Sequence, residues 1–212
     1  MLTAATSTIA LGMFGAGLAS ALETIGFVTG AVCVWLTIRE SVWNFPVGML
    51  SIATFAAVFI RARLYADAGL QVVFFVLEGI GWYLWLYGGA GRTALPITRT
   101  PSRRALGVAV AIPIIFAAQY VLLRKIGGAS PVWDALAAAI SLGAQWLLDR
   151  KHLENWLLWM TVNVIYIPLY LSKQLYLTSC LYGVFLCMAT LGLVQWHAAW
   201  RDRTLAAKHH FV

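Results

Sequence analysis

The chain repeats itself along its own length. When the 212-residue sequence is shifted by 111 positions, residues 23–85 align with residues 134–196 without a gap and share 12 identical residues. The matches include polar and aromatic types that an apolar composition alone does not bring into phase: Trp35 with Trp146, Arg39 with Arg150, Asn44 with Asn155, Tyr65 with Tyr176 and Trp85 with Trp196. The pattern indicates a duplicated folding unit, and a duplicated apolar chain is typical of membrane transporters.

The composition indicates that this unit folds within a lipid bilayer. Hydrophobic residues make up 61% of the chain and charged residues only 11%, whereas a soluble domain carries about 25% charged residues. The net charge of +7 comes from short Lys and Arg clusters between apolar runs, so it indicates membrane topology rather than binding to nucleic acid. The three cysteines show neither CxxC nor metal-ligand spacing, and we expect no metal or other cofactor.

The apolar runs predict seven membrane-spanning helices. They are long and continuous, without the alternation of barrel strands, and they cover about residues 21–38, 42–60, 67–88, 105–123, 132–149, 154–171 and 175–197. Run 105–123 has no partner under the 111-residue shift. Because a three-helix repeat begins and ends on opposite faces of the membrane, a second copy in the same orientation needs one extra crossing. We therefore expect an all-α integral membrane protein with seven core transmembrane helices in a 3+1+3 arrangement with parallel three-helix repeats.

This arrangement divides the chain into five parts. The first three-helix repeat covers 21–88, the loop and linker helix 89–131, the second three-helix repeat 132–197 and a cytoplasmic tail 198–212. Residues 1–20 form an apolar N-terminal segment without a basic start, which we expect to be an interfacial or an extra helix and not a cleaved signal.

Basic residues between the runs predict the orientation. One face carries five Lys and Arg residues and the other carries ten, of which the tail holds Arg201, Arg203 and Lys208. Since the more basic face is cytoplasmic, we expect a multi-pass protein of the cell (inner or plasma) membrane with its C-terminus in the cytoplasm.

A carboxyl group lies deep in the third predicted helix. Glu78 shares one helical face with Gln71 and Trp82, and no basic residue is near it in the sequence. Polar groups retained in a membrane usually face a cavity or another helix. Glu78 is thus either a protonated group bonded to a neighbouring helix or an anionic contact for a cationic solute or a proton. No second acidic residue is expected deep enough to pair with it.

A second polar stripe lies on the sixth predicted helix. Asn155, Trp159, Asn163 and Tyr166 follow at spacings of four, four and three residues. Asn bonds in several directions, and Trp and Tyr offer flat faces with a polar edge. These residues serve either as contacts between helices or as contacts for a ligand.

The repeat separates shared positions from diverged ones. Asn44 and Asn155 are equivalent and preserved, which suits a scaffold bond as well as a ligand contact. The deep polar positions differ between the copies: Glu78 aligns with Ala189, Asn163 with Ile52, Trp159 with Gly48 and Gln71 with Tyr182, while Gln145 adds an amide in the fifth run. Such divergence is expected when a symmetric scaffold surrounds an asymmetric ligand.

Several segments resemble the PnuC family of vitamin transporters. They are QVVFF at 71–75, GWYLW at 81–85, Trp133-Asp134, and RKHLENWLLW at 150–159 followed by Asn163. Members of that family take up nicotinamide riboside, with relatives for thiamine and riboflavin, and are distant kin of the SWEET sugar transporters. The resemblance covers about residues 21–197. It implies a 3+1+3 fold, one substrate between the halves, and facilitated diffusion drawn by phosphorylation of the vitamin inside the cell. This chain departs from it at Glu78, where nicotinamide riboside members often have Asn.

The resulting hypothesis is a carrier for a flat cationic vitamin, either nicotinamide riboside or thiamine. Trp159, Trp82 and Tyr182 would stack on its ring, and Glu78 would balance its charge. Asn163, Gln71 and Gln145 would form hydrogen bonds. A homo-oligomer is compatible with this reading. A membrane enzyme is not expected because no His lies deep in a run, while a channel or a scaffold without transport remains the alternative of another class.

Overall fold

The structure is a computed structural model, and it describes residues 21–209 except for 23, 62–64, 127–130, 173 and 175. The expected interfacial or extra helix at 1–20 lies outside the described residues. Within the described part the chain is all-helical and has seven α-helices. The first helix is Thr24–Ile38. It is followed by α2 (Asn44–Arg61), α3 (Tyr65–Tyr87), the short 3-10 helix η1 (Ala90–Arg92), α4 (Ser102–Lys125), α5 (Pro131–Leu148), α6 (Asn155–Ser172) and α7 (Tyr176–His209).

Four of these helices are long and apolar enough to cross a bilayer. They correspond to Asn44–Arg61, Ala68–Tyr87, Ser102–Lys125 and Ser179–Ala206. The linker helix α4 has the highest mean hydropathy of the four, 2.3, and none of its residues is buried by the protein. A long apolar helix without a single buried residue requires a lipid environment, so the expected helical membrane protein is confirmed at this level.

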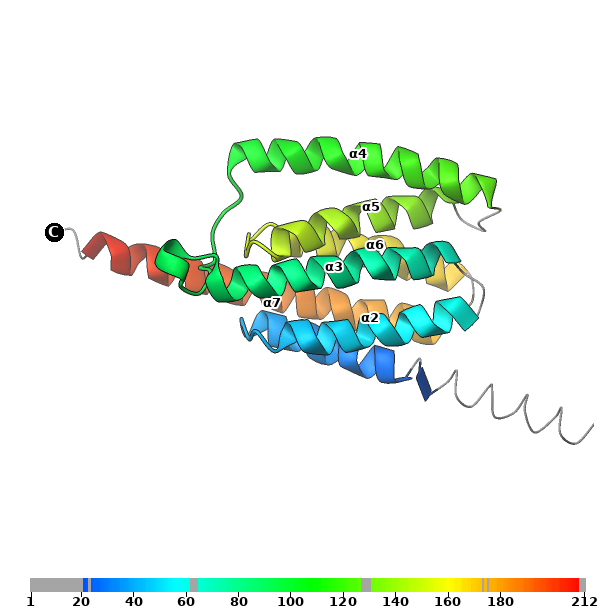
Figure 1. Ribbon diagram of the computed structural model, residues 1–212, viewed down its shortest axis with the longest axis horizontal. Helices are drawn as coiled ribbons and strands as arrows, with labels where there is room; N and C mark the ends of the chain where they lie inside the picture. Colours follow the sequence, from blue (N-terminus) through cyan, green and yellow to red (C-terminus); the bar gives the residue numbers. More distant parts are fainter. Residues whose placement is uncertain are drawn as a thin grey trace, which may run out of the picture.

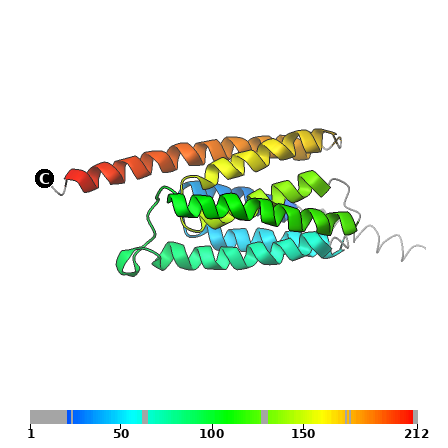
Figure 2. The same cartoon turned by 90° about the horizontal axis from the view of Figure 1, so that it is seen from above.

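The helices lie side by side along the long axis of the molecule, and α4 lies at the edge of the bundle beside α5 (Figures 1 and 2). Gly143 of α5 permits this contact, since a Cβ there would lie 3.1 Å from the Cδ1 atom of Ile112 in α4. Helix α7 continues 12 residues beyond the predicted end at 197. Residues 198–209 contain no Gly or Pro and include four Ala and two Arg, which favour continuation of a helix.

Three connections meet at one end of the bundle, which we call the loop end. They are residues 39–43, 88–101 and 149–154, and the C-terminal part of α7 extends from the same end (Figure 1). The 88–101 segment is tied to the 149–154 loop through Thr98, whose N–H donates to the Lys151 carbonyl at 3.0 Å and whose carbonyl accepts from Leu153 N–H at 2.9 Å. The 88–101 segment is therefore joined to the loop before α6 by direct backbone bonds.

The duplication is visible in reciprocal tryptophan bonds at the loop end. Trp85 Nε1 donates to the Leu148 carbonyl at 3.1 Å, and Trp196 Nε1 donates to the Thr37 carbonyl at 3.2 Å. The donors are 111 residues apart, and so are the acceptors. Each copy therefore holds the other through the same bond.

The helix starts repeat as well. The side-chain amide of Asn44 donates to the Ser41 carbonyl at 2.6 Å, and that of Asn155 donates to the His152 carbonyl at 2.7 Å. These bonds satisfy the carbonyls of equivalent tight turns before α2 and α6. They are the observed use of the preserved asparagine pair and supply the scaffold role that the sequence allowed.

The turns themselves use a left-handed residue at the same position of each copy. Glu40 has a φ of 54° and Lys151 a φ of 48°. Lys151 Nζ also bonds Glu40 Oε2 at 3.2 Å, and Arg203 Nη2 bonds Glu40 Oε1 at 2.9 Å. The equivalent residues thus meet each other as an ion pair.

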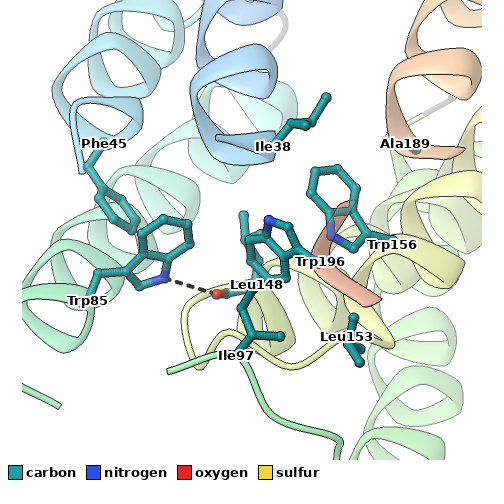
Figure 3. Close-up of a cluster of buried hydrophobic side chains, with 9 residues drawn as sticks. All are labelled: Ile38, Phe45, Trp85, Ile97, Leu148, Leu153, Trp156, Ala189 and Trp196. Atoms are coloured by element: carbon teal, nitrogen blue, oxygen red, sulfur yellow. Dashed lines mark hydrogen bonds between the residues drawn. The ribbon is translucent and has the colours of Figure 1, made fainter. Parts of the chain in front are cut away.

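The best-packed core lies near this end (Figure 3). Its buried members are Ile38, Phe45, Trp85, Ile97, Leu148, Leu153, Trp156, Ala189 and Trp196. Four rings form a chain from one copy to the other, with centroids 5.1 Å apart for Phe45–Trp85, 5.8 Å for Trp85–Trp196 and 5.4 Å for Trp156–Trp196. Because Phe45 is equivalent to Trp156, this ring chain follows the sequence repeat.

Candidate functional site

Glu78 is buried between the first three helices. The residue is only 7% exposed, and among the described residues Oε2 has no hydrogen-bond partner. Glycine at position 48 of α2 makes room for the carboxyl group, since a Cβ there would lie 3.1 Å from Glu78 Oε1 and 3.0 Å from Cys33 Sγ. A buried polar atom without a partner is costly, so Glu78 has the property of a group kept for a ligand or a proton.

A second buried carboxyl group lies near Glu78, which corrects the expectation that none would. Asp149 is fully buried, and its charge acts on Glu78. Gln145 Nε2 donates to Asp149 Oδ1 at 2.9 Å, while Oδ2 has no hydrogen-bond partner in the part of the chain that the structure describes. A Cβ at Gly81, three residues after Glu78, would lie 2.6 Å from Asp149 Oδ1. The two carboxyl groups therefore lie along one face of α3.

Asp149 was missed because it is the last residue of the predicted run 132–149 and precedes Arg150, a position typical of a membrane surface. The fold instead buries its side chain against Gly81 of α3. The repeat held a signal that could have found it, because Asp149 aligns with Ile38. An acid in place of a core isoleucine is the same kind of divergence that singled out Glu78.

The predicted stripe on α6 is partly buried against the ring core. Asn163 is only 6% exposed, and Trp159 is half-buried and packs on the core cluster. Trp159 aligns with Gly48 of the first copy, and Ala189 aligns with Glu78. The first copy therefore has a small residue on its second helix and a large one on its third, and the second copy has the reverse. Bulk and space are thus exchanged between the copies at the same depth.

Tyr182 and Tyr166 are brought together on α7 and α6. Their ring centroids are 4.8 Å apart, and Tyr170 stacks on Tyr182 at 5.2 Å with an interplanar angle of 16°. Phe185 continues the cluster at 6.1 Å from Tyr182 and lies 6.5 Å from Phe27 of the first helix. This aromatic cluster joins α6 and α7 to the opposite copy.

The remaining predicted contacts on α3 are less enclosed. Gln71 is half-buried, and Trp82 is 36% exposed. The most buried line of α3 follows Glu78, Gly81 and Trp85, which places Trp82 at the edge of that face. Trp82 is therefore not gathered with Glu78 in the way that the common stripe predicted.

Two cavities open at the loop end. None of the ten residues predicted to contact the substrate lines either of them. One of about 440 Å³ is lined by Glu40, Ala94, Leu95, Pro96, Lys151 and Arg203. The other, of about 340 Å³, is lined by Leu84, Gly88, Leu95, Thr98, Arg104, Arg150 and His152. The residues that the structure describes contain no group of three or more His, Cys, Asp or Glu side chains that could hold a metal ion.

Burial shifts the pKa of a basic residue at the loop end. Burial lowers the pKa of Lys151, and the neighbouring Glu40 carboxylate opposes that shift. The Lys151 ammonium also lies 4.3 Å from the centroid of the Trp85 ring, a favourable cation–π contact. The ion pair of Glu40 and Lys151 thus lies directly on the aromatic core.

Comparison with known proteins gives a consistent assignment. Residues 20–198 match the family described as Nicotinamide mononucleotide transporter. The chain is 29% identical over 215 residues to the nicotinamide riboside transporter PnuC of Escherichia coli (strain K12), covering 89% of this chain and 90% of that protein. It is 24% identical over 179 residues to the riboflavin/roseoflavin transporter RibM of Streptomyces davaonensis, covering 82% and 83%.

A solved structure shares the fold. It is described as the crystal structure of the vitamin B3 transporter PnuC, and it superposes with a TM-score of 0.69 at 23% sequence identity. The match covers 86% of this chain and 83% of that one. At this identity the likeness concerns the fold alone.

Proposed function

This chain belongs to the nicotinamide mononucleotide transporter family, which consists of membrane transporters and not of enzymes, and from that premise we propose that it carries nicotinamide riboside across the cell membrane. Uptake proceeds downhill by facilitated diffusion with alternating access, and the vitamin is the NAD precursor that the cell consumes. Relatives from Escherichia coli and Neisseria mucosa, 29% and 27% identical, are nicotinamide riboside transporters and support this substrate.

The proposed architecture is two parallel three-helix repeats, 21–88 and 132–197, with α4 as the linker in 89–131 and seven crossings in total. The reciprocal bonds of Trp85 and Trp196 support this division. The loop end faces the cytoplasm, since it carries most of the Lys and Arg residues, including Arg104 and Arg203. The bundles rock around a site between them so that it opens to each side in turn.

The buried carboxyl group of Glu78 is the observation that carries the choice of a cationic substrate. An ionised carboxylate without a counter-charge is unstable where water is excluded. The pyridinium of nicotinamide riboside supplies that counter-charge. Asp149 adds negative potential, and the amide of Gln145 orients it. Thiamine, whose thiazolium is also a flat cation, is the second candidate. Riboflavin is uncharged and is disfavoured for the same reason.

The aromatic and amide contacts complete the proposed site. Trp159 and Tyr182 stack on the ring, with Tyr166 behind Tyr182 at 4.8 Å. Asn163 and Gln71 bond the amide and hydroxyl groups. Trp82 is proposed as a contact at the rim, in keeping with its 36% exposure. Asn44 and Asn155 are proposed to act through the turns that they hold.

Binding of the cationic vitamin is linked to the ionisation of Glu78, as an effect of pH on affinity and not as coupled transport of a proton. In the empty site, Glu78 and Asp149 are buried near each other, and two neighbouring carboxyl groups do not both remain ionised. A positively charged vitamin favours the ionised form of Glu78, so its binding releases a proton. The Cys33 thiol is the other titratable group against this carboxyl group.

The test is calorimetric binding and proteoliposome uptake with nicotinamide riboside, thiamine and riboflavin. We expect saturable uptake of nicotinamide riboside that unlabelled nicotinamide riboside inhibits. Variants Trp159→Ala and Asn163→Ala should each bind at least about tenfold more weakly while remaining folded. Flux that does not saturate would indicate a channel, and absence of flux would indicate a scaffold. Preference for thiamine over nicotinamide riboside would replace the substrate but retain the carrier.

A further inference from the structure

A basic pocket at the loop end is separate from the proposed vitamin site. Its volume is about 340 Å³, and it lies between the end of α3, the segment before α4 and the 149–154 loop. Three of its lining residues are Arg104, Arg150 and His152, and none is acidic. None of the ten residues assigned to the vitamin lines it.

His152 fixes the position of Arg104. Arg104 Nη1 lies 3.1 Å from His152 Nε2, and a guanidinium can only donate, so Nε2 is the acceptor. Nδ1 must then carry the ring proton and donate to Thr98 Oγ1 at 2.9 Å. Burial, followed by the positive charge of Arg104, lowers the pKa of His152. His152 is therefore neutral and serves to orient Arg104.

Arg150 is fixed by a different contact. Its guanidinium lies 4.0 Å from the centroid of the Trp146 ring, and Nη1 donates to the Trp146 carbonyl at 3.1 Å. A guanidinium has five N–H donors, so this bond leaves donors available at the pocket. Both arginines are thus oriented before any ligand arrives, which reduces the entropy lost on binding.

The positive charge of the pocket is only partly offset. Among the described residues, neither Arg104 nor Arg150 forms an ion pair with a carboxylate. Asp149 lies behind Arg150 and attracts it, but its Oδ1 atom accepts from Gln145. Glu154 is bound instead by the N–H and hydroxyl of Thr100, at 2.8 and 2.6 Å. An anion in the pocket would relieve the repulsion between the two guanidinium groups.

We propose that Arg104 and Arg150 form a binding site for a phosphate group. Paired guanidinium groups bind phosphate oxygens through charge-assisted bonds, and basic pockets between membrane helices bind anionic head groups. The phosphate comes either from an anionic lipid, since the exposed apolar helix α4 begins beside the pocket, or from a small soluble phosphate ester. The site does not depend on which vitamin is carried.

The test compares two double variants of the full-length protein in a neutral detergent. Arg104→Gln with Arg150→Gln removes the site. The matched control, Arg103→Gln with Arg201→Gln, removes the same charge from two exposed arginines of α4 and α7 near the same end. The probes are phosphatidylglycerol, phosphatidylcholine, inorganic phosphate and adenosine monophosphate. Retained ligand is counted by native mass spectrometry, and affinity is taken from titrated thermal shifts.

We expect at least one phosphate-bearing anionic probe to bind the wild-type protein about tenfold more tightly than the site variant, with less than a twofold loss in the control. Binding of phosphatidylglycerol alone identifies a lipid site, and binding of the soluble phosphates alone identifies a site for a phosphate ester. Arg104→Lys with Arg150→Lys keeps the charge but not the planar fork, and it should bind with intermediate affinity. This variant also provides the test if the glutamine variant does not fold. Equal binding by wild type, site variants and control would overturn the proposal.

Discussion

The loop end preserves the sequence repeat, whereas the deep polar region departs from it. At the loop end both copies use the same residues for the same bonds, as the pairs Trp85 with Trp196 and Asn44 with Asn155 show. In the deep region Glu78 aligns with Ala189, and Trp159 aligns with Gly48. The comparison teaches that the bonds that hold the scaffold are the same in both copies, whereas the deep polar and aromatic side chains differ.

The largest effect is expected in the symmetric region. Trp85→Ala removes a fully buried ring and its bond to Leu148, so it should lower the free energy of unfolding by about 3 to 5 kcal/mol. Trp82→Ala, three residues earlier and 36% exposed, is the control and should cost less than about 1 kcal/mol. Thermal unfolding in detergent measures both. Equal costs would show that the reciprocal tryptophans are not the scaffold.

The asymmetric region should respond in binding rather than in stability. Glu78→Gln preserves shape and removes the negative charge, so we expect about 2 to 3 kcal/mol of lost binding free energy, or a Kd about 30- to 150-fold higher. The unfolding temperature should not fall, because the buried carboxyl group has an unpaired atom in the native protein. Calorimetry gives the Kd. An unchanged Kd would place Glu78 outside the vitamin site.

The same carboxyl group predicts a pH dependence with a definite sign. Because the cationic vitamin favours ionised Glu78, binding releases a proton, and affinity falls by up to about tenfold per unit as the pH is lowered through the titration of the empty site. Above that range the affinity is constant. In Glu78→Gln the slope should shrink to what Asp149 contributes. If the wild-type affinity does not depend on pH, vitamin binding is not linked to the ionisation of Glu78.

The smallest effect is expected for the ion pair between the equivalent residues Glu40 and Lys151. Glu40→Lys and Lys151→Glu should each destabilise the protein by about 1 kcal/mol, while the double exchange restores part of the loss. The coupling is modest because the Glu40 side chain is 21% exposed and also contacts Arg203. A double-mutant cycle of unfolding free energies measures it. Zero coupling would mean that the pair does not link the copies.

Much of the helix order could be predicted from the sequence because long apolar runs have few alternatives in a membrane. The expected run 105–123 became α4, and the expected run 42–60 became α2, each within a few residues. The extension of α7 to His209 was not predicted, since it leaves the apolar run and depends on helix propensity alone.

The candidate site could be predicted less completely. Glu78 and Asn163 were singled out and are buried, and Tyr182 does meet Tyr166. Asp149 was not found, because burial against α3 is not encoded in local hydropathy. The ligand roles of all these residues stay predictions. The 111-residue alignment nevertheless held a signal for it, because Asp149 aligns with Ile38.

By itself the sequence determined that this protein is helical and membrane-embedded and that it carries a 111-residue repeat, because apolar length and a phased repeat are properties of the chain alone. Only the tertiary structure decided that two carboxyl groups lie along one face of α3, and that Arg104 and Arg150 share a pocket. Those facts depend on the packing of loops and helices from distant parts of the chain, which sets burial and electrostatic proximity and has no local signature.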